Sequence, residues 1–280
     1  MENSVAILIN SCDAYVDVVR LNLCALKEFW PNMNYPIYLN TESACLSSDL
    51  FEIRNLNAKN PENYNWGSRF RNSLLNIKEE YVIVILDDFI LEHEIDVNTL
   101  YDVILKMKSN TNIDCFYLEY AKHNIIFDNE IGLHRLLNNN YYLVNTGPAL
   151  WRRKSLLDLV RPGDNPWVWE FFSMYRNSAR GLNIFGVPSE LDNVYKYDSR
   201  MGGAIYRGKW VYDVVINKLA KYDLDINLNE KGVIHENESF QRSFMWKLHF
   251  IVLGYKMVGI NSFHALFHFI RVKVFKKPLV

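Results

Sequence analysis

Residues 81–86 read Tyr81-Val82-Ile83-Val84-Ile85-Leu86, and Asp87-Asp88 follows them directly. The run is continuous, apolar and of strand length. A strand that is apolar on both faces is typical of the centre of a parallel sheet that helices cover on both sides. The stretch therefore predicts an α/β protein whose central strand ends at the aspartate pair.

The residues before this strand predict a β-α-β unit. Residues 5–9 are short, β-branched and stopped by Asn10-Ser11, which indicates a buried strand. A helix over about 15–29 follows, because apolar residues recur there at helical spacing. Residues 36–39 form the second strand, and the β-α-β order implies parallel pairing with a right-handed crossover.

The rest of the chain continues this alternation, with no internal repeat. Residues 55–65 are a polar loop, and 66–77 a helix with one apolar face. Beyond the aspartate pair we expect helices at 98–108, 152–160, 166–180 and 210–221, strands at 114–118, 141–150 and 183–187, and a glycine-rich loop at 202–209.

The composition is that of a globular protein with a sizeable core. The chain has 280 residues and is 49% hydrophobic, 22% charged and 14% aromatic. This length is enough for one large α/β domain or for a domain with a smaller annex. A net charge of -1 gives no basic field for nucleic acid, so no nucleic-acid partner is expected. The four cysteines match no zinc or CxxC pattern and are expected to be reduced. The N-terminus lacks the features of a signal peptide, so the cytoplasm is the expected location.

The composition changes once, near residue 239. Residues 239–280 contain no Asp or Glu but seven Lys or Arg, with aromatic and aliphatic residues between them. The longest mostly apolar stretch, 248–260, is interrupted by Lys256 and is too short to span a bilayer. Such a segment fits an amphipathic helix on an anionic membrane, with the charges of 273–277 at the headgroups. It also fits a helical pair packed on the domain or on a second copy.

Asp87 and Asp88 are the first candidates for chemistry. In open α/β sheets, ligands bind at the carboxyl ends of the strands, and two adjacent carboxylates there repel each other unless a cation lies beside them. Carboxylate oxygens suit Mg²⁺ or Mn²⁺, which are often shared with substrate phosphates. The pair therefore predicts a metal–diphosphate site. On spacing alone, an Asp88 that caps a turn and an Asp87 that faces solvent explain the pair equally well.

Four segments surround the pair in a distinctive order. They are Tyr64-Asn65-Trp66-Gly67-Ser68-Arg69, Asn145-Thr146-Gly147-Pro148-Ala149-Leu150-Trp151-Arg152-Arg153, Asn165-Pro166-Trp167-Val168-Trp169-Glu170 and Gly202-Gly203-Ala204-Ile205-Tyr206-Arg207-Gly208-Lys209-Trp210. The ordered set resembles bacterial glycosyltransferases of the A-type (GT-A) fold that build surface polysaccharides such as O-antigen and capsule. The resemblance spans about residues 5–230.

This resemblance implies a GT-A-like, Rossmann-type, mostly parallel sheet flanked by helices. It divides residues 1–235 into a nucleotide-binding half (about 1–95) and an acceptor half (about 96–235), with 236–280 as a basic helical C-terminal extension. It also implies transfer of a sugar from a nucleotide diphosphate, with a UDP-sugar favoured, to a hydroxyl. The implied acceptor is a lipid-linked oligosaccharide at the inner face of the cell membrane.

The sequence departs from the family pattern at the aspartates. The fuller motif of such enzymes is Asp-any-Asp, whereas Phe89 follows Asp87-Asp88 here, so one acidic position is missing. Under the resemblance, Asp88 is assigned to the metal, Mn²⁺ or Mg²⁺, and Asp87 to the ribose or the metal.

The other binding candidates follow a strand, lie on the helix before the central strand, or lie in aromatic and glycine-flanked segments. Glycines let the backbone approach a ligand closely, and neighbouring cations suit a leaving diphosphate. The donor candidates are Ser11 and Asp13 for the base or ribose, Trp66 and Arg69 for the base or phosphate, and Arg207 and Lys209 for the diphosphate; Trp151, Trp167 and Trp169 are assigned to the acceptor. Trp66 also fits the core, and Arg207 and Lys209 also fit a basic surface turn.

Glu170 is the candidate base. An inverting transfer needs a group that removes the proton of the acceptor hydroxyl. Desolvation between Trp167 and Trp169 is expected to raise the pKa of this carboxyl, and an acidic residue after a Trp-containing turn has this role in related A-type enzymes. The alternative is a helix that starts at Pro166, in which the helix dipole favours a glutamate in the first turn.

Two other functions fit parts of the sequence. A nucleotidyltransferase acting on a sugar phosphate keeps the fold, but such enzymes usually carry a Gly-rich loop with a basic residue straight after the first strand, where Asn10-Ser11-Cys12-Asp13 stands here. A non-enzymatic, membrane-associated carbohydrate-binding protein fits the aromatic content and the tail. It leaves Asp87-Asp88 at the end of a central strand unexplained.

Overall fold

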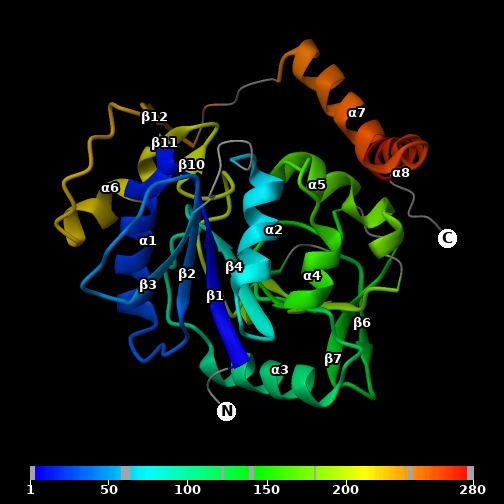
Figure 1. Cartoon of the computed structure of the whole chain (residues 1–280), viewed down its shortest axis with the longest axis horizontal. Helices are drawn as coiled ribbons and strands as arrows, with labels where there is room; N and C mark the ends of the chain where they lie inside the picture. The colour runs from blue at the N-terminus through cyan, green and yellow to red at the C-terminus, as the bar shows by residue number, and fades with distance from the viewer. Residues whose placement is uncertain are drawn as a thin grey trace.

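A nine-stranded sheet forms the centre of the protein in a computed structural model, which describes residues 4–57, 64–120, 123–138, 142–179, 181–236, 238 and 242–275. Figure 1 shows the sheet with helices on both sides. In spatial order, its strands are β3 (Ile53–Asn57), β2 (Ile37–Thr41), β1 (Val5–Asn10), β4 (Tyr81–Leu86), β8 (Ala149–Arg152), β5 (Cys115–Tyr117), β9 (Ile184–Gly186), β7 (Leu133–Leu136) and β6 (Ile125–Asp128).

The central strand β4 is buried on both faces, as its apolar run predicts. Tyr81, Ile83 and Ile85 pack into one hydrophobic core, and Val82 and Val84 into another on the opposite face. This division follows from the two-residue period of side chains along a strand. The expected α/β architecture is thereby confirmed.

Helices cover both faces of the sheet (Figure 1). α1 (Val16–Phe29), α3 (Val97–Ser109) and α6 (Tyr212–Lys221) contribute to the first core. α2 (Trp66–Asn76), α4 (Arg153–Leu159) and α5 (Pro166–Phe172) contribute to the second. Short 3-10 helices lie at Asp13–Tyr15, Ser173–Tyr175, Asn177–Ala179 and Glu190–Asp192.

The sheet is parallel only in its first half. β3, β2, β1 and β4 pair in parallel, which confirms the prediction from the β-α-β order. Beyond β4 the sheet is mixed, because β8 runs antiparallel to both β4 and β5, while β5 and β9 are parallel. The β6–β7 hairpin, which the sequence did not predict, adds two further antiparallel pairings.

Several expected elements have different bounds. The strand expected at 141–150 is limited to β8, because Asn145, Gly147 and Pro148 favour a turn before it; residue 141 lies outside the described residues. The helix expected at 166–180 ends as α5 at Phe172 and continues as 3-10 turns. The start of the loop expected at 55–65 belongs to β3, and residues 58–63 lie outside the described part.

The segment expected as a glycine-rich loop contains a hairpin. β10 (Ile205–Tyr206) and β11 (Lys209–Val211) are antiparallel, and β12 (Val233–Ile234) joins β11 in a small second sheet. The two turn residues, Arg207 and Gly208, both have positive φ, which is the pattern of a type I′ hairpin turn. The turn places Arg207 at the tip of the hairpin.

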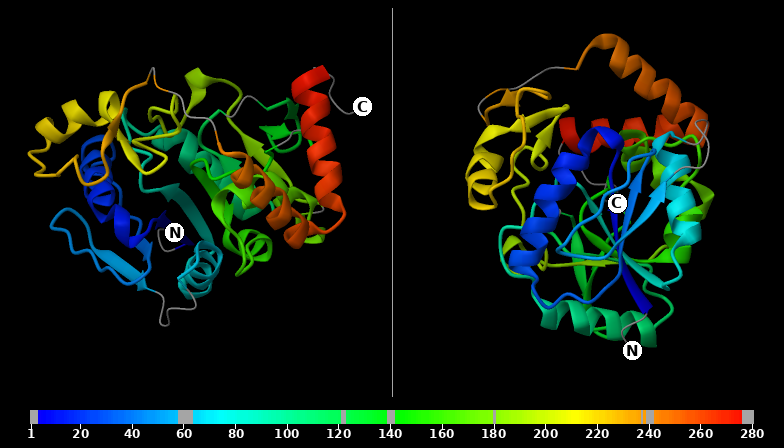
Figure 2. Two further views of the ribbon diagram at one scale, coloured as in Figure 1. Left: turned by 90° about the horizontal axis from the view of Figure 1, so that it is seen from above. Right: turned by 60° about the vertical axis from the view of Figure 1, so that its left-hand side comes forward.

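The C-terminal residues form a helical pair, α7 (Phe244–Val258) and α8 (Asn261–Phe275). The pair lies beside α5, outside the main sheet (Figure 2). Its seat is a third hydrophobic cluster that includes Phe171, Phe172 and Ala265. A Cβ at Gly254 would lie 2.3 Å from the Phe172 ring, so α7 approaches α5 at a point that excludes any side chain.

No helix within the described residues is both long and apolar enough to cross a bilayer. The prediction of a helical C-terminal extension is confirmed by α7 and α8. Lys276 and Lys277, which the sequence places near membrane headgroups, lie outside the described residues, and the side chain of Lys273 is likewise not described.

Candidate functional site

The carboxyl ends of β1 and β4 bring the first candidate residues together. The two strands are parallel and Asn10 is level with Leu86, so Ser11 and Asp87 leave the sheet at the same edge. The Ser11 hydroxyl donates a hydrogen bond of 2.5 Å to Asp87 Oδ2. Two residues that are far apart in the sequence thus form one hydrogen-bonded pair at the strand ends.

A cavity of about 1090 Å³ opens at this edge. Its size suits a ligand that is larger than a single sugar. The residues predicted for the site that line it are Ser11, Trp66, Arg69, Asp87, Asp88, Trp167, Glu170 and Arg207. The structure therefore gathers eight of the sequence-derived candidates, from both halves of the chain, around one space.

Asp87 and Asp88 lie almost fully buried in the wall of the cavity. Burial raises the pKa of Asp87 to about 7 and holds the pKa of Asp88 well above its usual range, where the charge of Asp87 adds to the effect. Within the described residues neither carboxylate forms an ion pair. Two buried carboxyl groups at such close quarters favour a cation or a shared proton.

The loop before β10 holds the second aspartate in place. The Ala204 amide donates a hydrogen bond of 2.8 Å to the backbone carbonyl of Asp88. At Gly203, φ is +139°, and a Cβ there would lie 2.7 Å from Asp88 Oδ2. Glycine is required here for two reasons. The positive φ is strained for any other residue, and a side chain would displace the Asp88 carboxylate.

The aspartate pair fits a divalent cation only as part of a shared coordination sphere. No group of three or more His, Cys, Asp or Glu in the described chain could hold a metal ion. Mg²⁺ is commonly held by one or two carboxylates together with water and substrate phosphates. Two buried carboxylates without an ionic partner among the described residues match this second arrangement.

Glu170 projects from α5 into the same cavity. Its Oε1 accepts hydrogen bonds from the Thr146 amide (2.8 Å) and the Thr146 hydroxyl (2.6 Å). Burial raises the pKa of Glu170, and the two Thr146 contacts offset part of that rise. Among the described residues, none donates a hydrogen bond to Oε2, so that oxygen is placed to accept a proton.

Arg69 braces the strand ends as well as lining the cavity. Its guanidinium donates to the Ser11 carbonyl (2.7 Å) and the Tyr64 carbonyl (2.9 Å), and forms an ion pair with Glu42 (2.9 Å). Trp66, one turn earlier on α2, lines the cavity and packs on Trp169 with 5.8 Å between the ring centres. Arg69 thus holds the end of the cavity where β1 stops, in addition to any contact with a ligand.

Two of the three predicted acceptor tryptophans do not reach the cavity. Trp151 lies in β8 and is buried in the core against Tyr117. Trp169 is also buried, behind Trp66 and Phe70. The inward positions of a strand and a helix bury both side chains, so neither ring is exposed to a ligand in this structure. Only Trp167, on the exposed side of α5, lines the cavity.

Two predicted donor residues also lie elsewhere. Asp13 accepts hydrogen bonds from the Ser43 amide and hydroxyl and from the Ala44 amide, so its carboxylate holds a neighbouring turn outside the cavity lining. Lys209 lies at the exposed start of β11 and does not line the cavity. The alternation of a hairpin strand turns Lys209 away from the face that Arg207 reaches at the tip.

Glu119 is a cavity residue that the sequence analysis missed. It lies just after β5, and burial raises the pKa of its carboxyl while hydrogen bonds from Tyr197 and Ser199 lower it. Tyr197 stacks on Phe89 at 4.4 Å, and the charges of Glu119 and Asp88 add to the burial that raises its own pKa. The signal was available, since an acid directly after the strand expected at 114–118 follows the same rule as the aspartate pair.

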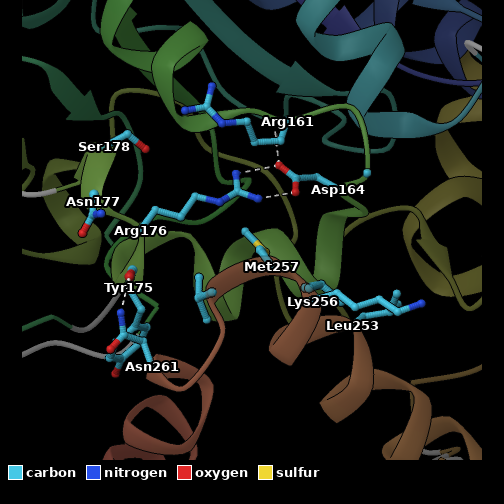
Figure 3. Close-up of a pocket in the computed structure, with 13 residues that line it drawn as sticks. Arg161, Asp164, Tyr175, Arg176, Asn177, Ser178, Leu253, Lys256, Met257 and Asn261 are labelled. Atoms are coloured by element: carbon cyan, nitrogen blue, oxygen red, sulfur yellow. Dashed lines mark hydrogen bonds and ion pairs between the residues drawn. The ribbon is translucent and has the colours of Figure 1, made fainter.

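A second cavity of about 620 Å³ lies between the main domain and the helical pair. Figure 3 shows Arg176 and Asp164 pointing toward each other across one wall, where they form a two-pronged ion pair. Leu253 and Met257 of α7 line the opposite wall. None of the residues predicted for the site lines this cavity.

Comparison with known proteins identifies the fold class. No protein-family model and no curated protein matches the sequence. Residues 1–349 of TarS from S. aureus match in structure over 97% of this chain and 74% of that chain, with 11% identity and a TM-score of 0.50. A longer TarS structure matches at 10% identity and a TM-score of 0.46, over 81% of this chain, which covers only 41% of its length.

Two structures with ligands are also similar. TarS 1–349 in complex with UDP-GlcNAc matches with 11% identity, 97% and 76% coverage and a TM-score of 0.48. The galactosyltransferase LgtC with donor and acceptor sugar analogs matches with 12% identity, 54% and 58% coverage and a TM-score of 0.35. At such identities the likeness concerns the fold, and this chain has a GT-A-like fold.

Proposed function

We propose that this chain moves a sugar from a UDP-sugar to a hydroxyl of a lipid-linked oligosaccharide, with inversion, in the synthesis of a bacterial surface polysaccharide. The observation that carries the proposal is one cavity that gathers Asp87, Asp88, Glu170 and Arg207 at the strand ends of a GT-A-like sheet. Acids beside a diphosphate, a base for the acceptor and a cation for the leaving group are the elements of sugar transfer.

The donor lies across the strand ends in this proposal. Ser11 and Trp66 line the end of the cavity where β1 stops, and this end takes the nucleoside. Asp87 and Asp88 face the diphosphate and ribose. Mn²⁺ or Mg²⁺ held by these carboxylates would neutralise charge that develops on the leaving phosphate.

Glu170 acts on the acceptor. The acceptor oxygen forms a bond to the anomeric carbon while the bond from that carbon to the phosphate oxygen breaks, and the electron pair leaves with the nucleotide. The hydroxyl proton passes to Glu170 Oε2. Thr146 keeps Oε1 occupied by two hydrogen bonds, which orients the carboxylate for this transfer. Trp167 offers an exposed aromatic face for an acceptor sugar.

Donor binding tests this assignment through thermal stability. A ligand that binds only the native state at a hundred times its Kd stabilises it by about 2.7 kcal/mol, which corresponds to a rise in Tm of roughly 5–10 °C for a chain of this size. We expect UDP-sugars with Mn²⁺ to produce this rise, and GDP-, CMP- and dTDP-sugars to produce less. A flat response to every UDP-sugar, with and without metal, would contradict the donor assignment.

The proposed place of action is the cytoplasmic face of the cell membrane, with α7 and α8 on its surface. The support is a large apolar surface on this pair, which includes Phe244, Met245, Ile260, Phe263 and Phe267 among the exposed side chains. Exposed apolar surface of this extent marks an interaction site. The lack of acidic residues in 239–280 makes that surface compatible with anionic lipid.

Vesicle flotation tests the membrane contact. The protein is expected to float with phosphatidylglycerol-containing vesicles at low salt and less at high salt, because screening weakens the contact with anionic lipid. Ile260→Glu with Phe263→Glu should lower binding by more than about tenfold, since two apolar side chains leave the interface. Leu191→Glu, at an exposed leucine outside the pair, is the matched control. Unchanged binding of the double variant would refute a contact through α7 and α8.

A further inference from the structure

Arg242 joins the cavity from the opposite end of the chain. It precedes α7 by two residues, and its side chain lines the cavity together with Ser243 and Trp246. Its guanidinium carbon lies 3.7 Å from the centre of the Trp246 ring and 5.5 Å from that of Trp167. Two aromatic faces, one from α5 and one from α7, therefore hold this cation in place.

Arg207 reaches the same region from the β10–β11 turn. It stacks on Tyr206 at 5.2 Å and lines the cavity. The charge of Arg207 is close enough to lower the pKa of Arg242, second only to the effect of burial. Within the described chain, neither guanidinium forms an ion pair or donates a hydrogen bond.

Arg207 and Arg242 line the same cavity without a carboxylate partner among the described residues, and an anion bound between them would offset their repulsion. Like charges repel, and each guanidinium carries a fork of N–H donors that matches a phosphate group. Stacking on an aromatic ring uses the face of a guanidinium and not its N–H donors, and both side chains line the cavity. The same cavity contains the aspartate pair, so cationic and acidic groups face one space, as a metal-bridged diphosphate requires.

We propose that Arg242 and Arg207 together bind the diphosphate of the donor, and that Arg242 is supplied to the site by the start of the C-terminal helical pair. The inference deepens the proposed function and takes the identity of the donor from it. It replaces Lys209, which the sequence suggested as the partner of Arg207. Because Ser243 caps α7 through the Trp246 amide (3.1 Å), the position of Arg242 depends on how α7 is seated.

Seating of α7 and binding of the diphosphate are then linked. Whatever fixes α7 against α5 also fixes Arg242 in the cavity, and a bound diphosphate in turn holds the start of α7. The helical pair thus has a second role besides its apolar surface, since it completes the donor site.

The test compares ligands with and without phosphate. Titrations of UDP, inorganic pyrophosphate and uridine into the full chain with Mg²⁺ are followed by calorimetry. Arg242→Gln is expected to raise the Kd of UDP and pyrophosphate by roughly 10- to 100-fold, as for loss of hydrogen bonds to a charged group, and to leave uridine unchanged. Arg242→Lys should recover part of the affinity, and Lys247→Gln, at an exposed position one turn into α7, should behave as wild type.

The outcomes separate this inference from the proposed function. If wild type binds UDP and Arg242→Gln binds it equally well, the inference fails and the donor assignment stands. If wild type binds pyrophosphate through Arg242 but no UDP-sugar, the arginine pair stands and the donor assignment fails. Equal losses for uridine and UDP in Arg242→Gln, with reduced helix content by circular dichroism, would show a purely structural role and overturn the inference.

Discussion

Replacement of Asp88 by asparagine is expected to lower the rate of sugar transfer by about 10²- to 10³-fold. The asparagine side chain would fill the same space but lack the charge that holds a cation against the diphosphate. The backbone hydrogen bond from Ala204 to residue 88 does not involve the side chain, so the strand end should keep its shape. Initial rates at saturating donor and Mn²⁺, compared with wild type, measure the effect.

The pH dependence of stability gives an independent test of the aspartate pair. In the metal-free protein the pKa of Asp87 is raised to about 7, and that of Asp88 lies well above its usual range. When folding raises the pKa of a carboxyl, the group's contribution to the free energy of unfolding is fully present below the pKa of the unfolded chain. This contribution is lost as the pH rises through the pKa of the folded protein. Wild type should therefore lose stability as pH rises from about 4 toward 8.

Asp88→Asn should flatten this loss, because it removes the carboxyl whose pKa burial and the charge of Asp87 hold well above its usual range. Urea unfolding at several pH values checks the slope, and Asp225→Asn, at an exposed aspartate, is the control for a simple change of net charge. Gly203→Ala offers a second variant, since its Cβ would press on Asp88 Oδ2. Full transfer activity in Asp88→Asn would remove Asp88 from the donor site.

Replacement of Glu170 by glutamine is expected to lower kcat by about 10²- to 10⁴-fold, the usual contribution of a general base. The amide oxygen of the glutamine can still accept both hydrogen bonds from Thr146, so the local fold should persist. Donor affinity should be unchanged, because the proposed role begins only when the acceptor loses its proton. Steady-state kinetics together with a Kd for UDP separate the two quantities.

The pH profile follows from the same group. Burial raises the pKa of Glu170 above its ordinary 4.5, and a base works only when it is deprotonated. Transfer by wild type should thus decline on the acid side at a higher pH than an exposed glutamate would give, and this limb should be lost in Glu170→Gln. Glu119→Gln is the matched variant, a second buried carboxyl in the cavity. A large loss in Glu119→Gln with normal activity in Glu170→Gln would assign the base to Glu119.

Local patterns predicted the centre of the fold well. β4 has the bounds 81–86 that its apolar run gives, and α2 begins at Trp66 as expected. These signals are local. A strand that is buried on both faces must be apolar at every position, and a helix with one buried face must be apolar at every third or fourth position. The aspartate pair was found in the same way, since the end of a parallel strand determines the edge at which its next residues lie.

The direction of the later strands could not be predicted in this way. β8 is apolar and short, and nothing in its residues states that it runs antiparallel between β4 and β5. Strand direction depends on the path of the chain between strands. For the same reason Trp151 and Trp169 were assigned to a surface that they do not reach, because burial depends on which element covers a side chain.

The apolar central strand, its acidic end, the helices beside it and the acid-free, basic tail could all be predicted from the amino-acid sequence. Each of these properties belongs to consecutive residues or to a short repeat along the chain. The packing of the folded chain places Glu119 in the cavity and Lys209 outside it, and it brings Arg242 of the tail to the cavity that Arg207 lines. Contacts between distant segments arise from the packing of whole elements, and the pattern of residues around each position does not contain them.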